Sequence, residues 1–226
     1  SLTALARDRS GRLWVGTEGS GVSYRSADGS RWDLLNRFDG LKSDSITTIT
    51  AVGDTVWIGT NSGLTLWNGK QVLGSIPEGQ IAPFRSDVIT GIVQHGDSLW
   101  IATAKGLYVS RISTGLLQWS GADANLNPNN GYQALATDGV ALFTLTGNGL
   151  RLRRTFDPGG QWLIPGVAPM GTTLRMVRDR GTVLLSTEAG IFRWNGTDWD
   201  NLAPGFPSNS ADPAGDVARI HAEVCE

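Results

Sequence analysis

The sequence predicts an all-β fold made of repeated units, and three observations lead to this prediction. A short phrase recurs about every 43 residues, as LWVGT, VWIGT and LWIAT at residues 13–17, 56–60 and 99–103. A threonine closes five consecutive copies of the phrase, at Thr17, Thr60, Thr103, Thr146 and Thr187. A glycine and an aliphatic residue follow each threonine, at Gly21-Val22, Gly63-Leu64, Gly106-Leu107, Gly149-Leu150 and Gly190-Ile191. Because three independent landmarks stay in step, chance does not explain the repeat.

Each copy divides into four short β segments. The first carries two anchor residues three positions apart, at Leu2/Leu5, Ile46/Ile49, Ile89/Ile92, Tyr132/Leu135 and Thr173/Met176. The second is the recurring phrase, the third follows the glycine, and the fourth often carries a tryptophan, as in RWDLL, LLQWS, QWLIP and DWDNL. Asn68-Gly69 and Asn195-Gly196 lie between the third and fourth segments, where a two-residue hairpin needs positive φ angles.

Four strands in about 43 residues are typical of one blade of a β-propeller. A blade is packed between two neighbours, which explains why these strands do not alternate cleanly between apolar and polar residues. We expect the tryptophan of the second strand to be buried between blades. Small residues of the first strands fit a crowded axis, among them Ala4, Thr47, Thr48, Thr90 and Gly91. The absence of a sustained 3.6-residue period excludes helical solenoids.

The repeat predicts a single propeller over residues 1–226. Its four-stranded blades are expected at roughly residues 1–44, 45–87, 88–130, 131–171 and 172–214. The segment 215–226 repeats the first-strand pattern, with Val217 and Ile220 as anchors, and is expected to begin a sixth blade. Because residues 2–8 already fill the first strand of a ring closed at five, we expect part of a six- to eight-bladed propeller. A closed five-bladed ring is the alternative.

Composition excludes several classes of protein. A net charge of −2 and a pI of about 5.7 give no field that would attract nucleic acid or an anionic membrane. Cys225 is the only cysteine, so an internal disulfide framework and a cysteine-based zinc site are excluded. The sequence has no apolar run of about 18 residues, so no direct membrane insertion is expected.

The phrase D-x-x-G-x-L-W-V-G-T at residues 8–17, followed by a glycine and an aliphatic residue, resembles the two-component regulator propeller repeat. Residues 56–64 and 99–108 also match, whereas ALFTLT and VLLST in the later copies have lost the tryptophan and the glycine. In that family the repeats form the extracytoplasmic sensing part of bacterial hybrid histidine kinases. They also occur in surface or periplasmic proteins without a kinase. The resemblance implies a bacterial, periplasmic or cell-surface module that binds or scaffolds.

No residue pattern predicts catalysis, a cofactor or a metal. The fold also resembles a propeller lyase that acts on streptogramins with a histidine base. His95 and His221, the only histidines, do not fall on second-to-third loops, and no acid recurs beside them.

The stretch 123–130 begins like a calcium loop but has Pro128 where the turn glycine belongs, so we expect a polar connector. Arg151, Arg153 and Arg154 are expected to be solvated charges.

The remaining candidates for a binding site come from their place on the loop face of a propeller. On the second-to-third loops they are Glu18, Asn61, Lys105, Asn148 and Glu188; on the connectors they are Arg85, Asp87 and Asn130. The sequence thus predicts a non-catalytic exported propeller that binds a protein partner as a scaffold within a larger protein. A glycan- or ligand-sensing ectodomain of a hybrid two-component regulator is the alternative, and a lyase is a third hypothesis.

Overall fold

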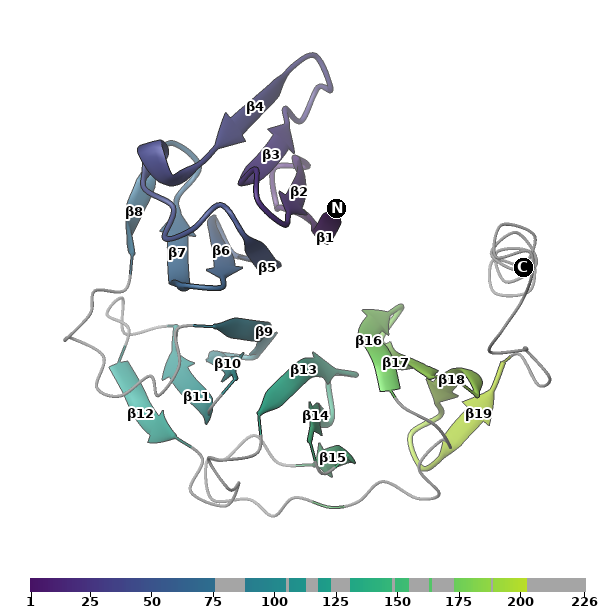
Figure 1. The fold of residues 1–226 in the computed structure, drawn as a ribbon. Coiled ribbons are helices and arrows are strands. Elements are labelled where there is room, and N and C mark those ends of the chain that lie inside the picture. The colour runs from purple at the N-terminus through teal and green to yellow at the C-terminus, as the bar shows by residue number, and fades with distance from the viewer. Residues whose placement is uncertain are drawn as a thin grey trace.

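The computed structural model is an arc of small antiparallel sheets around a common centre (Figure 1). It describes residues 1–75, 88–104, 106–112, 118–122, 131–147, 149–154, 163, 173–187 and 189–202. These residues form five sheets, called here blades 1 to 5 in chain order, and the strands of each blade run outward from the centre in sequence order. The predicted all-β propeller fold is confirmed. The segment expected to begin a sixth blade, 215–226, lies outside the described residues.

The strands have the following bounds. Blade 1 contains β1 (Leu2–Arg7), β2 (Leu13–Thr17), β3 (Val22–Arg25) and β4 (Trp32–Leu35), and the short 3-10 helix η1 (Arg37–Asp39) follows it. Blade 2 contains β5 (Ile46–Val52), β6 (Thr55–Thr60), β7 (Gly63–Trp67) and β8 (Val72–Ser75). Blade 3 contains β9 (Ile89–His95), β10 (Ser98–Thr103), β11 (Gly106–Arg111) and β12 (Gln118–Ala122).

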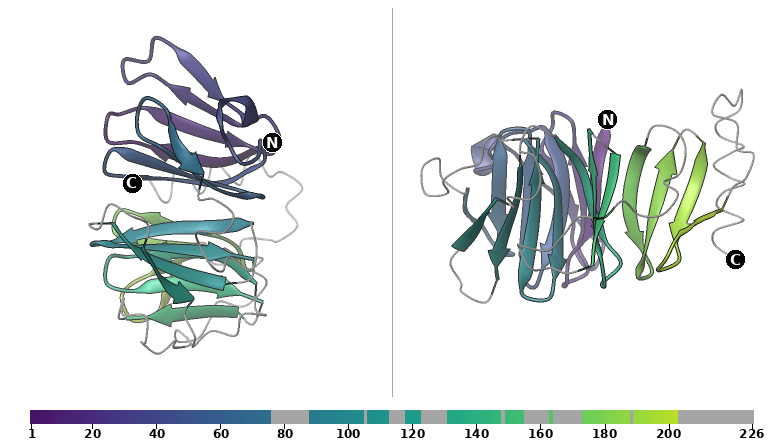
Figure 2. Two further views of the ribbon diagram at one scale, coloured as in Figure 1. Left: turned by 90° about the vertical axis from the view of Figure 1, so that its left-hand side faces the viewer. Right: turned by 90° about the horizontal axis from the view of Figure 1, so that it is seen from below.

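Blade 4 contains β13 (Tyr132–Thr137), β14 (Leu142–Thr146) and β15 (Gly149–Arg153). Of its expected fourth strand only Leu163 is described, and it exchanges two backbone hydrogen bonds of 2.8 and 2.7 Å with Leu152. Blade 5 contains β16 (Thr173–Asp179), β17 (Thr182–Thr187), β18 (Gly190–Trp194) and β19 (Trp199–Asn201). Figure 2 shows the blades from two further sides, with neighbouring sheets packed face to face.

The recurring phrase is explained by the packing between blades. Each phrase forms the second strand of a blade, and the first four place an aromatic side chain against the next blade, at Trp14, Trp57, Trp100 and Phe143. Trp14, for example, is fully buried with Ile46 and Ile49, the two anchors of β5. Four separate hydrophobic clusters fill the four junctions between neighbouring blades in this way. The prediction that the second-strand tryptophan packs between blades is confirmed.

The threonine that closes each phrase fixes the turn into the third strand. In every blade its hydroxyl donates a hydrogen bond to the carbonyl oxygen of the following glycine, over 2.9, 2.8, 3.0, 3.1 and 3.4 Å in blades 1 to 5. Four of these five glycines have positive φ angles, from 74° at Gly21 to 142° at Gly190, which explains the residue type. The repeated threonine and glycine therefore act together to close the turn between the second and third strands.

The glycine inside the phrase makes room for the next blade. A Cβ atom at Gly16 would lie 2.6 Å from Cγ2 of Ile46, and one at Gly59 would lie 2.8 Å from Cγ2 of Ile89. Both isoleucines are first anchors of the following blade. Close approach of the blades therefore requires a very small side chain at these two positions.

The acidic residue of the motif supports the first tryptophan. The Asp8 carboxylate accepts hydrogen bonds from Trp14 Nε1 at 2.9 Å, from Ser10 Oγ at 2.7 Å and from Arg12 Nε at 2.7 Å. Burial alone would raise the pKa of Asp8, but these hydrogen bonds outweigh it and hold the pKa below its usual value. Arg12 in turn lies over the ring of Trp67 in blade 2, 4.4 Å from its centroid.

The prediction of a solvated arginine group is wrong for Arg153. This side chain is fully buried, and its guanidinium lies 5.3 Å from the ring centroid of Trp100 in blade 3. Arg151 is half-buried and Arg154 is exposed. The physical reason is that a blade has a neighbour on each face, so a long side chain of β15 reaches an indole ring before it reaches solvent.

Candidate functional site

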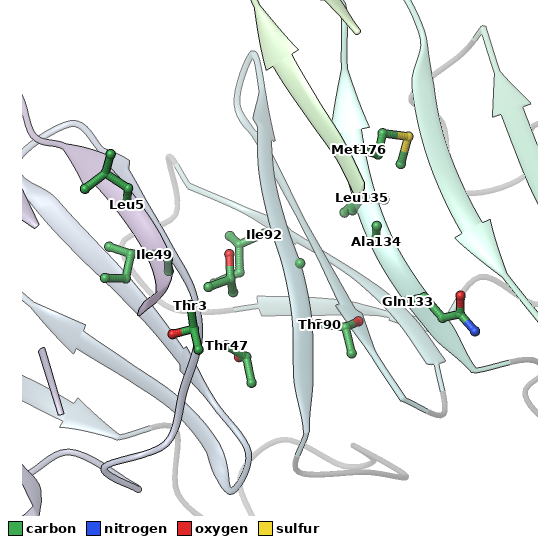
Figure 3. Close-up of a pocket in the computed structure, with 13 residues that line it drawn as sticks. Thr3, Leu5, Thr47, Ile49, Thr90, Ile92, Gln133, Ala134, Leu135 and Met176 are labelled. Carbon is green, nitrogen blue, oxygen red and sulfur yellow. The ribbon is translucent and has the colours of Figure 1, made fainter. Parts of the chain in front are cut away.

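An axial pocket of about 450 Å³ lies where the first strands of the five blades meet (Figure 3). Thr3, Thr47, Thr90 and Gln133 each supply a polar side chain to its lining, one from each of blades 1 to 4, and Thr48 of blade 2 adds another. Aliphatic side chains beside them include those of Ile49 and Ile92. The small residues of the first strands border this volume, and a Cβ atom added at Gly91 would lie 2.9 Å from Cβ of Leu135, so the first strands are closely packed at this position.

The four polar residues reach the axis through a repeated β-bulge. The pairing of the first and second strands skips one residue in each blade, between Leu2 and Ala4 in blade 1 and between Ile46 and Thr48 in blade 2. The same shift occurs at residue 90 in blade 3, at residue 133 in blade 4 and at residue 174 in blade 5. A bulge leaves its extra residue outside the ladder and re-aims the side chain, as is common beside functional sites. We call Thr3, Thr47, Thr90 and Gln133 the bulge ring.

Three hydroxyls of the bulge ring have no hydrogen-bond partner among the residues that the structure describes. The Oγ1 atoms of Thr3, Thr47 and Thr90 are buried from bulk solvent and contact no protein donor or acceptor. Leaving a buried hydroxyl unpaired costs about 1–3 kcal/mol, so proteins rarely keep three of them in equivalent positions. Each hydroxyl can donate one hydrogen bond and accept two, and Gln133 adds an amide that does both. Because the three threonine oxygens are buried, a ligand in the pocket can bond them only after the side chains rotate about χ1, whereas the exposed amide of Gln133 is already accessible.

The side chains that line the pocket carry no charge. Its described lining is made of threonine, glutamine, glycine and apolar residues, with no ionisable side chain among them. Proton transfer needs a titratable group within hydrogen-bond reach of the reacting atom, and the bulge ring does not supply one. In the described part of the chain, moreover, no cluster of three or more His, Cys, Asp or Glu side chains could hold a metal ion. The pocket is suited to binding an uncharged molecule through hydrogen bonds and apolar contacts.

The two predicted site residues that the structure describes lie outside the pocket. Glu18 is exposed on the loop after β2 and accepts a hydrogen bond of 2.6 Å from the Ser1 hydroxyl. Asn61 is exposed on the loop after β6, and its side-chain oxygen accepts a hydrogen bond of 3.0 Å from Ser62 Oγ. Neither residue lines the axial pocket. Lys105, Asn148, Glu188, Arg85, Asp87 and Asn130 fall outside the described residues, so their predicted role stays a prediction.

The bulge ring has a signal in the sequence that was given another meaning. In blades 1 to 4 a polar residue directly follows the first anchor, in the pairs Leu2-Thr3, Ile46-Thr47, Ile89-Thr90 and Tyr132-Gln133. From the sequence, Thr47 and Thr90 were expected to be small side chains at a crowded axis, and Thr3 and Gln133 were not singled out. Only the strand register shows that this position is the bulge.

Of the candidate catalytic and calcium-binding residues, the structure describes only His95. His95 ends β9 and does not line the axial pocket. Burial, followed by the positive charge of Arg178, lowers the pKa of His95 despite the opposing charge of Asp138. His221 and the stretch 123–130 lie outside the described residues.

Sequence comparison confirms the resemblance at the start of the chain. The family described as two component regulator propeller matches residues 1–19, which include the Asp8 and Trp14 pair. No protein with a curated function matches the sequence. In the part of the chain that the structure describes, no helix has the length and apolar character that a membrane span requires.

Solved structures share the fold at low sequence identity. The extracellular domain assigned to hybrid two component system BT3049 of B. thetaiotaomicron is 18% identical with a TM-score of 0.65, over 90% of this chain and 30% of that one. The extracellular domain of BT4673 from the same organism, assigned to a one component system, is 20% identical with a TM-score of 0.67, over 89% of this chain and 28% of that one. Virginiamycin B lyase from Staphylococcus aureus is 12% identical with a TM-score of 0.67, over 92% of this chain and 71% of that one. The chain thus spans less than a third of the two extracellular domains.

Proposed function

We propose that this chain is a non-catalytic binding propeller that works outside the cytoplasm as one part of a larger bacterial protein. The match to the two component regulator propeller family and the likeness to extracellular domains of two component systems support this place of action. The neutral bulge ring is the observation that carries the proposed activity. A pocket lined by unpaired hydroxyls and without an ionisable group favours recognition over reaction, even though a lyase shares the fold.

An uncharged small ligand that bears several hydroxyl or amide groups is the guest that fits best. The volume of about 450 Å³ is within the range of small-molecule sites. Gln133 and, after rotation about χ1, the three threonine hydroxyls would bond the polar groups of the ligand, while Ile49 and Ile92 would contact its carbon skeleton. This is the chemistry of a sugar unit, which favours a glycan- or ligand-sensing ectodomain.

Titration calorimetry with a panel of sugars tests this proposal. Neutral mono- and disaccharides are compared with their uronic acid and amino sugar counterparts on the full chain. The variant with Thr47→Val and Thr90→Val together loses two hydroxyls, each worth about 0.5–1.5 kcal/mol, so we expect affinity for the neutral ligand to fall by roughly 5- to 150-fold. Thr55→Val at the start of β6 removes the same group outside the pocket and should bind as the parent chain does. A preference for a charged sugar, or unchanged binding by the double variant, would contradict the proposal.

A protein-binding scaffold is the second candidate function. Four large apolar side chains of blade 1 are exposed, those of Leu2, Leu5, Trp32 and Leu34, and an exposed apolar row of this kind is typical of a contact surface. Affinity capture of one defined partner from the periplasmic fraction, abolished by Leu34→Asp and retained by Thr47→Val, would favour the scaffold. Capture that both variants retain would count against it.

A further inference from the structure

We infer that the loop of residues 36–44, which joins blades 1 and 2, pairs with the same loop of a second copy of this chain through Phe38. This loop includes the short helix η1 and lies at the outer rim, between β4 and β8 (Figure 1). None of its residues lines the axial pocket, so the inference does not depend on the proposed ligand.

Phe38 is 99% exposed, more than any other large apolar side chain that the structure describes. Single apolar residues are common on protein surfaces and need no partner. Two further observations set Phe38 apart. The loop that carries it is fixed by hydrogen bonds, and a hollow flanked by two opposite charges lies beside its ring.

Hydrogen bonds within the loop hold Phe38 in one place. The Asn36 side chain accepts a bond of 2.8 Å from the backbone N–H of Phe38. The Asp39 side chain accepts one of 3.0 Å from the backbone N–H of Asn36. Asp44 Oδ1 accepts a third, of 2.8 Å, from the backbone N–H of Arg37. The ring is therefore carried on a closed turn and not on an open loop.

Both neighbouring blades brace this turn. The backbone N–H of Gly21 in blade 1 donates to the carbonyl oxygen of Asp44 at 2.9 Å. The backbone N–H of Lys42 donates to Thr65 Oγ1 in blade 2 at 3.2 Å. Leu41 is buried in the hydrophobic cluster between the two blades. A partner therefore meets a loop that is already ordered, which lowers the entropy cost of binding.

A hollow of about 250 Å³ opens beside the ring, and its described lining is Arg37, Phe38 and Asp44. We call these three residues the rim patch. A cavity of about 150 Å³ can already hold benzene, so the hollow has room for a phenyl ring. Among the described residues, no carboxylate pairs with the Arg37 guanidinium, and only Oδ1 of Asp44 accepts a hydrogen bond. The rim patch thus offers a ring, a hollow and one charge of each sign.

The rim patch is complementary to itself. In a two-fold symmetric dimer, every contact of one residue with another is repeated with the two chains exchanged. Such an axis can place each Phe38 ring in the hollow of the other chain. The same rotation brings each Arg37 guanidinium to the Asp44 carboxylate of the other chain. A second copy therefore supplies by symmetry the ring, the hollow and both charges that a different partner would have to match separately.

The dimer is expected to be weak and reversible. The rim patch has three described residues, whereas a standard interface has about 20–30 residues on each side. Its stability should depend mainly on the two rings, since aromatic residues in a fitted pocket carry much of the energy of an interface. The exchanged ion pairs would fix the orientation of the two chains.

Sedimentation equilibrium of the full chain over a range of concentrations tests the pairing. We expect a monomer–dimer equilibrium whose dissociation constant rises about tenfold or more in Phe38→Ser, because two rings leave one interface. Val140→Ser removes an apolar side chain that is 67% exposed on blade 4, and it should leave the constant unchanged. Both variants should keep the urea midpoint of the parent chain, because both side chains face solvent.

Charge exchange tests the orientation. Arg37→Glu gives the rim patch two negative charges, and Asp44→Lys gives it two positive charges, so each variant should be monomeric alone. In an equal mixture, opposite charges meet at both contacts, and a heterodimer should form with an affinity close to that of the parent. Its formation would also show that Asp44→Lys keeps the loop in place despite losing the hydrogen bond from Arg37.

Three results would overturn the inference. The first is a chain that stays monomeric at every concentration. The second is a dimer that Leu34→Asp abolishes and Phe38→Ser leaves intact, because the exposed apolar row of blade 1 would then be the contact. The third is a charge mixture that stays monomeric while both variants unfold at the urea midpoint of the parent chain.

Discussion

The junction between blades 1 and 2 and the junction between blades 4 and 5 hold the same fold together with different chemistry. In the first, Trp14 stacks on Tyr24 at 4.6 Å and meets Trp67 edge-on at 4.9 Å, and Asp8 and Arg12 add a charged pair. In the second, Phe143 meets Trp194 at 5.3 Å and Trp199 at 5.9 Å. Tryptophan carries an indole N–H that needs an acceptor when it is buried, whereas phenylalanine does not. In blade 1 Asp8 supplies that acceptor to Trp14, whereas Phe143 holds the same packing position in blade 4 without needing one.

The largest effect is expected where both junctions are alike. Trp14→Ala and Phe143→Ala each remove a fully buried ring from a cluster between blades and should each lower the free energy of unfolding by about 3–5 kcal/mol. Urea denaturation followed by circular dichroism measures both losses. If either variant lost less than about 1 kcal/mol, that ring would not be holding its junction.

The next effect concerns the approach of the blades. Gly16→Ala places a Cβ atom 2.6 Å from Ile46 Cγ2, so blade 2 must shift, and overpacking of this kind costs about 1–3 kcal/mol. Gly147→Ala in blade 4 meets no atom within 4 Å and is the matched control. Thermal unfolding should show a lower Tm for the first variant and little change for the second. Equal melting temperatures would mean that the glycine of the phrase has another role.

The charged network of the first junction should cost less to remove than its ring. Asp8→Asn keeps the shape of the side chain but weakens the hydrogen bonds from Arg12 and Trp14, and we expect a loss of about 1–3 kcal/mol in urea denaturation. Asp54→Asn is the control, because its ion pair with Arg9 is long at 3.9 Å and exposed. That substitution should change the stability by less than about 0.5 kcal/mol. A similar loss for both variants would contradict the role of Asp8.

The smallest expected effect is on the pH dependence of the free energy of unfolding, and it comes from Asp8 alone. The pKa of Asp8 lies below its unfolded value, so the ionised carboxylate stabilises the folded chain above the unfolded pKa of about 4. That stability is lost as the pH falls through the folded pKa. We therefore expect Asp8→Asn to flatten the decline in unfolding free energy between about pH 5 and pH 2. Asp28, whose pKa is about 2, keeps its own decline in both proteins. Parallel curves for the parent and the variant would show that Asp8 titrates without coupling to folding.

The sequence predicts the blades well because the residues that define each strand and turn lie close together in the sequence and recur at a fixed spacing. The spacing of Trp14 and Thr17 and of their later copies identifies the strands, and Asn68-Gly69 identifies a turn that has a φ of 96° at the glycine. The bulge ring was missed because a register shift depends on pairing between strands, which no spacing reveals. The burial of Arg153 was missed because its partner, Trp100, belongs to a different blade. Residues such as Glu18 were chosen by their place on a loop, and the geometry does not bring that residue to the axis.

The central claim is that the threonines of the phrase are structural and the threonines of the bulge ring are kept for binding. Urea denaturation of two double variants tests it most directly. Thr60→Val with Thr103→Val removes two hydrogen bonds of 2.8 and 3.0 Å to turn glycines and should lose about 1–3 kcal/mol of unfolding free energy. Thr47→Val with Thr90→Val replaces two unpaired buried hydroxyls by methyl groups and should be as stable as the parent chain or more stable. A loss in the bulge ring as large as that in the turns would contradict the claim.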